Sequence, residues 1–120
     1  MNLYHSVTIG SLKLPGNLFL APVAGYTDRA FRSICVEMGA DFSFTELVSA
    51  EALTRNPHHY GLGSPTASPE AALIKRGRKE KHYCVQLFGA DPDVLGRACA
   101  LLAPLRPDAV DLNEAVRFPK

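Results

Sequence analysis

The sequence predicts an α/β fold in which parallel strands alternate with helices. Four short apolar runs, at residues 18–21, 42–45, 83–88 and 109–112, have the length and composition of strands. Helical patterns lie between them, and most connections from strand to helix are short. This alternation is typical of parallel βαβ units. Both an open doubly wound sheet and a (β/α)8 barrel fit this order.

A short hairpin is predicted at residues 7–14, where apolar residues alternate with polar or small ones around Gly10-Ser11. The first strand of the sheet follows at 18–21, and Pro22 ends it. An uninterrupted apolar run of this kind is expected of a strand buried on both faces of a parallel sheet.

The first helix is predicted at residues 28–38, with Thr27 or Asp28 as its N-cap and Gly39 at C′. One apolar stripe of an amphipathic helix is formed by the residues at positions i, i+3, i+4 and i+7, which are Phe31, Ile34, Cys35 and Met38.

The rest of the chain repeats the alternation. A helix from about 48 to 54 follows the strand at 42–45, and the loop at 56–69 contains many Pro, Gly and Ser residues. The strand at 83–88 ends at Gly89, and the next helix starts with Asp91 as N-cap and Pro92 at N1 and runs to about Ala103. The strand at 109–112 comes almost immediately afterwards.

Length and composition indicate a single domain over residues 1–120, with an ordinary hydrophobic content of 47%. The net charge of +1 gives no overall attraction to nucleic acid. The three cysteines lack C-x-x-C spacing and the histidines lack metal-ligand spacing, so neither a disulfide nor a metal is predicted. No export signal and no membrane span are predicted, and we expect a reducing cytoplasm.

Three segments follow the ends of predicted strands, where barrel enzymes place their chemistry. They are APVAGYTD at 21–28, VQLFG at 85–89 and DLN at 111–113. A Rossmann G-x-G-x-x-G is absent after the first strand. Together the segments resemble the tRNA-dihydrouridine synthases, whose first strand ends in A-P-M-A-G-x-T-D-x-x-F-R. The match continues to Phe31-Arg32, with Val23 in place of the methionine, and residues 45–50 are also similar to the family.

This resemblance implies a partial (β/α)8 TIM barrel, formed by its first four strands and the N-terminal β-hairpin. It also implies FMN at the carboxyl ends of the strands, NADPH as reductant and tRNA as partner, for the reduction of uridine to 5,6-dihydrouridine. In the family, hydride passes to C6 of the uracil and a cysteine protonates C5. By position, the resemblance places Pro22, Val23 and Ala24 against the flavin ring, Gln86 on its polar edge, and Asn113 beside flavin and uracil.

The residues alone leave other interpretations open. The segment 21–25 can be a strand-ending turn, Gln86 can make a structural hydrogen bond, and Asn113 can be a turn residue. The basic run that Glu80 interrupts is expected to be a solvated loop rather than a phosphate site; it contains Lys75, Arg76, Arg78, Lys79 and Lys81. Cys35, Cys84 and Cys99 are expected to be buried small hydrophobes.

The sequence departs from the family after the fourth strand, where the family has D-[LIV]-N-x-G-C-P-x-x-K. Ala115, Val116 and Arg117 replace the Gly-Cys-Pro centre. Valine has no proton to donate, so no catalytic residue is predicted. A whole barrel takes about 250 residues and holds phosphate after strands seven and eight.

We therefore expect a truncated FMN-binding domain that is inactive alone and able to self-associate through open sheet edges. Two alternatives remain. One is a non-catalytic half-barrel or interaction module, and the other is an FMN-dependent barrel oxidoreductase of the dihydroorotate-dehydrogenase type.

Overall fold

The computed structural model describes residues 2–63 and 68–115 and contains a hairpin and a parallel sheet. Strands β1 (Val7–Ile9) and β2 (Leu12–Leu14) pair antiparallel. The sheet has the order β3-β4-β5-β6, and each neighbouring pair is parallel. Its strands are β3 (Phe19–Leu20), β4 (Phe42–Ser49), β5 (Tyr83–Phe88) and β6 (Ala109–Asn113). The predicted hairpin and the predicted parallel sheet are both confirmed. The expectation that the first strand of the sheet is buried on both faces is wrong, since Leu18 is 55% and Phe19 38% exposed: β3 is the edge strand, and among the described strands it pairs only with β4.

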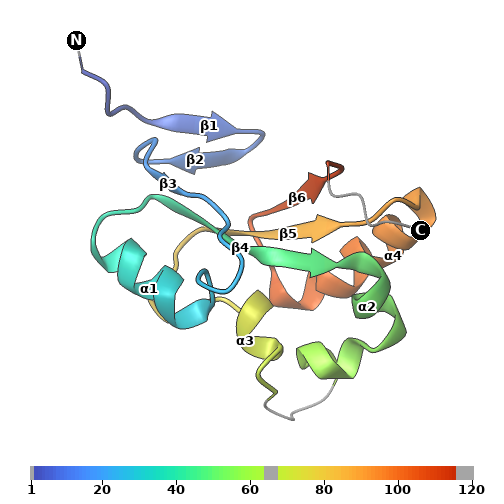
Figure 1. The fold of residues 1–120 in the computed structure, drawn as a ribbon. Coiled ribbons are helices and arrows are strands. Elements are labelled where there is room, and N and C mark those ends of the chain that lie inside the picture. The colour runs from blue at the N-terminus through green and yellow to red at the C-terminus, as the bar shows by residue number, and fades with distance from the viewer. Residues whose placement is uncertain (1, 64–67, 116–120) are drawn as a thin grey trace.

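The helices gather on one side of the sheet (Figure 1). They are α1 (Arg29–Glu37), α2 (Ala50–Arg55), α3 (Ala71–Ile74) and α4 (Pro92–Leu102), with 3-10 turns η1 (Pro57–Tyr60) and η2 (Ala103–Leu105). The order of strands and helices is that of the first four strands of a (β/α)8 barrel. The predicted fold class is therefore confirmed.

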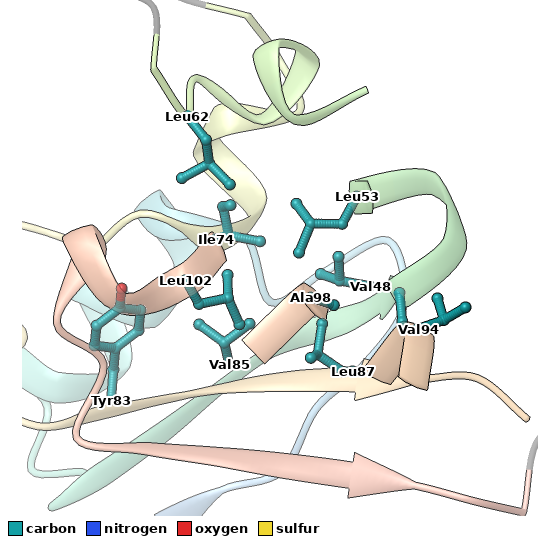
Figure 2. Packing of buried hydrophobic residues seen from close by; sticks show 11 residues of the cluster. Val48, Leu53, Leu62, Ile74, Tyr83, Val85, Leu87, Val94, Ala98 and Leu102 are labelled. Carbon is teal, nitrogen blue, oxygen red and sulfur yellow. The ribbon is translucent and has the colours of Figure 1, made fainter. Parts of the chain in front are cut away.

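The main core lies between the sheet and the helices (Figure 2). Alternate residues of β5, namely Tyr83, Val85 and Leu87, point to this side and are fully buried. They meet Ala98 and Leu102 of α4, which lie on one stripe of that helix. A strand whose alternate residues pack on an amphipathic helix is the usual arrangement of a βαβ unit.

The opposite face of the sheet carries a smaller apolar cluster near the amino ends of the strands. Leu14 of the hairpin packs there with Phe42 and Cys84, and all three are buried. The rings of Phe42 and Phe44 meet edge-on, with centroids 5.0 Å apart. The hairpin thus covers the amino end of this face, as predicted, and the carboxyl end is left for other groups.

Strand β4 is longer than predicted, because it continues to Ser49 through an irregularity between Phe44 and Leu47. Helix α2 consequently starts at Ala50, with the Ser49 hydroxyl accepting a hydrogen bond from the Ala52 amide at 3.2 Å. The single turn α3 was not predicted, since four residues are too few to show a helical period.

The apolar stripe predicted for α1 does not face the core. Phe31 is 40% exposed, Ile34 59% and Met38 82%, whereas Arg32 on another side of the helix is fully buried. An amphipathic helix usually buries its apolar stripe. Here the buried position is taken by a guanidinium group that forms several hydrogen bonds, described below.

Candidate functional site

The carboxyl ends of the four parallel strands lie along one edge of the sheet, as they must in a parallel arrangement. Strand register places Gln86 opposite Asp111, and Phe88 opposite Asn113. Gln86 and Asp111 project from the face that the helices do not cover, since Val85 and Leu87 occupy the helix side. Polar side chains therefore meet on the open face at this edge.

Gln86 is the most buried of the predicted site residues, with 7% of its surface exposed. Its side-chain Nε2 donates a hydrogen bond of 2.6 Å to Oδ2 of Asp111, and its backbone N–H donates to Oγ1 of Thr45 at 3.0 Å. Its Oε1 accepts no hydrogen bond from any of the residues that the structure describes. The structural hydrogen bond considered for Gln86 is thus present, and it uses only the nitrogen of the amide.

Asn113 ends β6, and its Oδ1 accepts a hydrogen bond of 3.1 Å from the backbone N–H of Ala115. This is the turn role that the sequence left open for Asn113. The amide nitrogen of its side chain makes no hydrogen bond within residues 2–63 and 68–115. Asn113 can therefore shape the turn and still offer a donor beside Gln86.

The segment after β3 forms a turn held by one buried hydroxyl. The side chain of Thr27 is fully buried, and its Oγ1 accepts from the Val23 amide at 3.1 Å and donates to the Val23 carbonyl at 3.2 Å. Gly25 has φ +82°, which favours glycine, and its N–H donates to Oε1 of Glu46 on β4. Val23 and Ala24 are exposed and Pro22 is half-buried. The three residues predicted to face a flavin ring thus belong to a turn at the carboxyl end of β3, and the hydrogen bonds of Thr27 and Glu46 fix this braced turn.

A buried ion pair fixes the far end of this turn. Arg32 donates through Nε to Oε2 of Glu80 at 3.1 Å, and both side chains are fully buried. Its Nη1 donates to the Thr27 carbonyl at 2.8 Å, and its Nη2 to the Lys75 carbonyl at 2.7 Å. Glu80 also accepts from Ser43 on β4 at 2.5 Å. The turn, α1, β4 and the segment before β5 are joined in one network.

The expected solvated loop is therefore wrong for Glu80 and Arg76. Glu80 is the buried partner of Arg32. Arg76 forms an ion pair with Asp108 at 3.1 Å and lies 4.6 Å from the centroid of the Tyr83 ring. Arg76 and the glutamate that interrupts the run are therefore structural, because buried or partly buried charges need partners.

Burial raises the pKa of both ionisable groups at the start of β5. It raises the pKa of the Tyr83 phenol to about 12, although Arg76 and Arg32 oppose the shift. It also raises the pKa of the Cys84 thiol to about 12, and the Asp111 carboxylate acts in the same direction. A thiol of such high pKa is a poor general acid near pH 7. Cys84 is buried as expected, whereas Cys35 and Cys99 are only half-buried.

Sequence reasoning missed Glu46 and Asp111 as members of the site. Asp111 stands two residues before Asn113 on one strand, and a period of two is a signal that could have found it. Glu46 had no such signal, because its place depends on the irregularity in β4. Val116, which stands where the family has its cysteine, lies outside the described residues.

Within residues 2–63 and 68–115, no group of three His, Cys, Asp or Glu side chains is arranged to bind a metal ion. In the same residues, no helix has the length and hydropathy needed to cross a membrane.

Comparison with known proteins identifies the family. The family model "Dihydrouridine synthase (Dus)" matches residues 19–114. The chain is 42% identical over 119 residues to a "Probable tRNA-dihydrouridine synthase" of Treponema pallidum, covering 98% of this chain and 32% of the relative. It is 36% identical to the protein of that name in Aquifex aeolicus, covering 88% of this chain and 30% of the relative. It is 35% identical to "tRNA-dihydrouridine synthase B" of Pseudomonas aeruginosa, covering 89% of this chain and 29% of the relative.

Proposed function

Because the chain belongs to the dihydrouridine synthase family, we propose that it forms the first wall of an FMN site in an enzyme that reduces uridine to 5,6-dihydrouridine in tRNA. The chain spans about a third of the length of the relatives it matches, at 32%, 30% and 29%. The activity, with NADPH as reductant and the cytoplasm as its place, is therefore proposed for a whole protein of this family.

One observation carries the proposal. The Gln86 side chain is held by Asp111 through Nε2, so its Oε1 acceptor, which accepts no hydrogen bond from the described residues, remains available on the open face at the edge of the sheet where β3 also ends. A ligand that covers this oxygen must offer it a hydrogen-bond donor, because a polar atom buried without a partner costs free energy, and the polar edge of an isoalloxazine ring carries such a donor. The residues present thus fit a flavin. When bound, the flavin supplies the hydride that reduces the uracil ring.

The residues of this chain would hold and orient the flavin. Exposed Val23 and Ala24, with half-buried Pro22, offer apolar and backbone surface to a flat ring. Gln86 offers an acceptor to the ring's polar edge, and Asn113 offers its side-chain N–H groups. These assignments depend on the braced turn, because a ring can stack only on atoms held in one place.

Proton donation is the step for which this chain has no donor in the family position, since Val116 carries no acidic proton. Loss of a positioned general acid typically lowers a rate by about 10²- to 10⁴-fold. The alternative of a non-catalytic module rests on this same substitution. We expect a polypeptide of these 120 residues alone to make no dihydrouridine and to lose FMN on gel filtration.

The test measures dihydrouridine in unmodified tRNA after incubation with protein, FMN and NADPH. The 120-residue polypeptide and its Val116→Cys variant should give no product. A chimera that continues into the remainder of the Treponema pallidum relative, with Ala115→Gly, Val116→Cys and Arg117→Pro, should give product. The same chimera with Val116 retained is the matched control and should be at least about 100-fold slower. Equal rates for these two chimeras would contradict the missing proton donor.

A further inference from the structure

The Gln86 amide has a defined orientation, and Asp111 determines it. The two residues face each other across β5 and β6, and Nε2 lies 2.6 Å from Oδ2 of Asp111. An ionised carboxylate can only accept hydrogen bonds. If the amide were turned over, two oxygen atoms would stand at that short distance and repel each other. The amide nitrogen therefore points to Asp111 and the amide oxygen points away from it.

Few other groups compete for this carboxylate. Among the described residues, no Lys, Arg or His side chain forms an ion pair with Asp111. The side chain opposite it across the sheet is that of Gln86 itself. The Asp111 carboxylate therefore accepts its hydrogen bond from the Gln86 amide without competition from a cationic side chain of the described residues.

From this geometry we infer that Asp111 is a specificity-determining residue that makes Gln86 present an acceptor, so that the site selects a ring edge carrying an N–H donor. The inference rests on the proposed flavin site and names the edge that it takes. An oxidised isoalloxazine has one ring N–H, the imide N3–H between two carbonyl groups. A ligand whose corresponding nitrogen is alkylated or carries no hydrogen would leave Oε1 buried and unpaired, which disfavours binding.

The first arm of the test needs no ligand. In the ¹⁵N-labelled 120-residue chain, one Nε2 proton of Gln86 is expected to be shifted downfield and to exchange slowly with water. In Asp111→Asn the asparagine N–H can donate to Oε1, so the amide is free to turn and the shifted signal should disappear. Asp93→Asn, which changes an exposed carboxylate on α4, is the matched control and should leave it in place. A Gln86 signal that is the same in Asp111→Asn would overturn the inference.

The second arm compares FMN with its N3-methyl derivative at millimolar concentration, by their shifts of the Gln86 side-chain signals. The unaltered chain and Asp93→Asn should bind FMN about tenfold more tightly than 3-methyl-FMN or better. Asp111→Asn should reduce that ratio to below about threefold, because the turned amide can donate to the ring instead. Equal binding of both flavins by the unaltered chain would overturn the selectivity. Binding of neither flavin would count against the proposed flavin site, whereas the ligand-free arm would still decide whether Asp111 orients Gln86.

Discussion

Helices α1 and α4 flank the same sheet, but the chain attaches them by different physical means. Helix α4 buries Val94, Ala98 and Leu102 against β5, and these contacts belong to the main core. Helix α1 has Arg32 as its one buried residue, which is held by hydrogen bonds to Glu80 and to backbone carbonyls. Local signals predicted both helices, an apolar stripe for α1 and the Asp91-Pro92 cap for α4, but the side of each helix that packs depends on what the fold places beside it.

The largest effect should come from removing the polar attachment of α1. Arg32→Met leaves the Glu80 carboxylate buried without its cation, and breaking one partner of such a pair costs about 3–5 kcal/mol of unfolding free energy. Urea unfolding followed by far-UV circular dichroism measures this loss. Arg55→Met, which breaks the exposed ion pair with Glu51, is the control and should cost less than about 1 kcal/mol.

A second variant keeps this prediction testable if Arg32→Met does not fold. Adding Glu80→Gln to Arg32→Met leaves no unpaired charge, and the new amide can still meet Ser43 and the Gly77 amide. The double variant should therefore be more stable than Arg32→Met alone. The polar attachment would be contradicted if Arg32→Met cost no more than Arg55→Met.

The apolar attachment of α4 should be tested by a matched pair of truncations. Leu102→Ala removes a fully buried side chain from the core and should cost about 2–5 kcal/mol. Ile34→Ala removes an aliphatic side chain of the same size from the stripe of α1, where it is 59% exposed, and should change stability by less than about 0.5 kcal/mol. Equal costs would show that the stripe of α1 is buried in solution, contrary to the structure.

Local capping should be alike in the two helices, in contrast to their packing. Asp28 accepts from the Phe31 amide at 2.8 Å, and Asp91 accepts from the Asp93 amide at 2.8 Å. Replacing either aspartate by alanine should cost about 1 kcal/mol, while replacement by asparagine should cost little because it keeps the acceptor. Urea unfolding measures these costs, and a loss of unfolding free energy for only one of the two alanine variants would contradict the equivalence of the two caps.

Tyr83 lies where the two attachments meet, packed in the core with the guanidinium carbon of Arg32 5.9 Å from its ring centroid. Its folded pKa of about 12 exceeds the unfolded value of 10.0. The folded state thus keeps a proton that the unfolded state loses, so its contribution is full below pH 10 and is lost as pH rises toward 12.

Tyr83→Phe should therefore match the unaltered chain at pH 7, since it removes a buried hydroxyl that has no hydrogen-bond partner among the described residues. Between pH 10 and 12 the variant should lose less stability than the unaltered chain. Cys84 contributes to both curves with the same sign, so their difference isolates Tyr83. Parallel curves over this range would contradict the buried phenol.

Local signals account for what the sequence predicted well. The bounds of β5 follow from an apolar run that ends at Gly89, and the start of α4 follows from Asp91-Pro92. Both signals lie within a few residues, so they need no knowledge of the fold. The edge at which Pro22, Gln86 and Asn113 stand also follows from parallel strand order.

The remaining features depend on contacts between distant parts of the chain. Arg32 and Glu80 are separated by 48 positions, and Gln86 and Asp111 by 25, so each pair depends on strand order and register. The irregularity in β4 that brings Glu46 to the turn leaves no period in the sequence. Charged residues predicted to be solvated can therefore become buried once a partner is supplied by another element.

The most direct test of the proposed flavin site measures which backbone amide signals of the ¹⁵N-labelled chain shift when FMN is added. Binding should be weak, and the largest shifts should fall at Val23 to Gly25, at Gln86 and at Asn113. The amides of α2 and α4, which lie on the covered side of the sheet, should not move. Shifts centred on the helix side of the sheet, or no shifts at millimolar FMN, would contradict the claim that the open face binds flavin at the carboxyl ends of the strands.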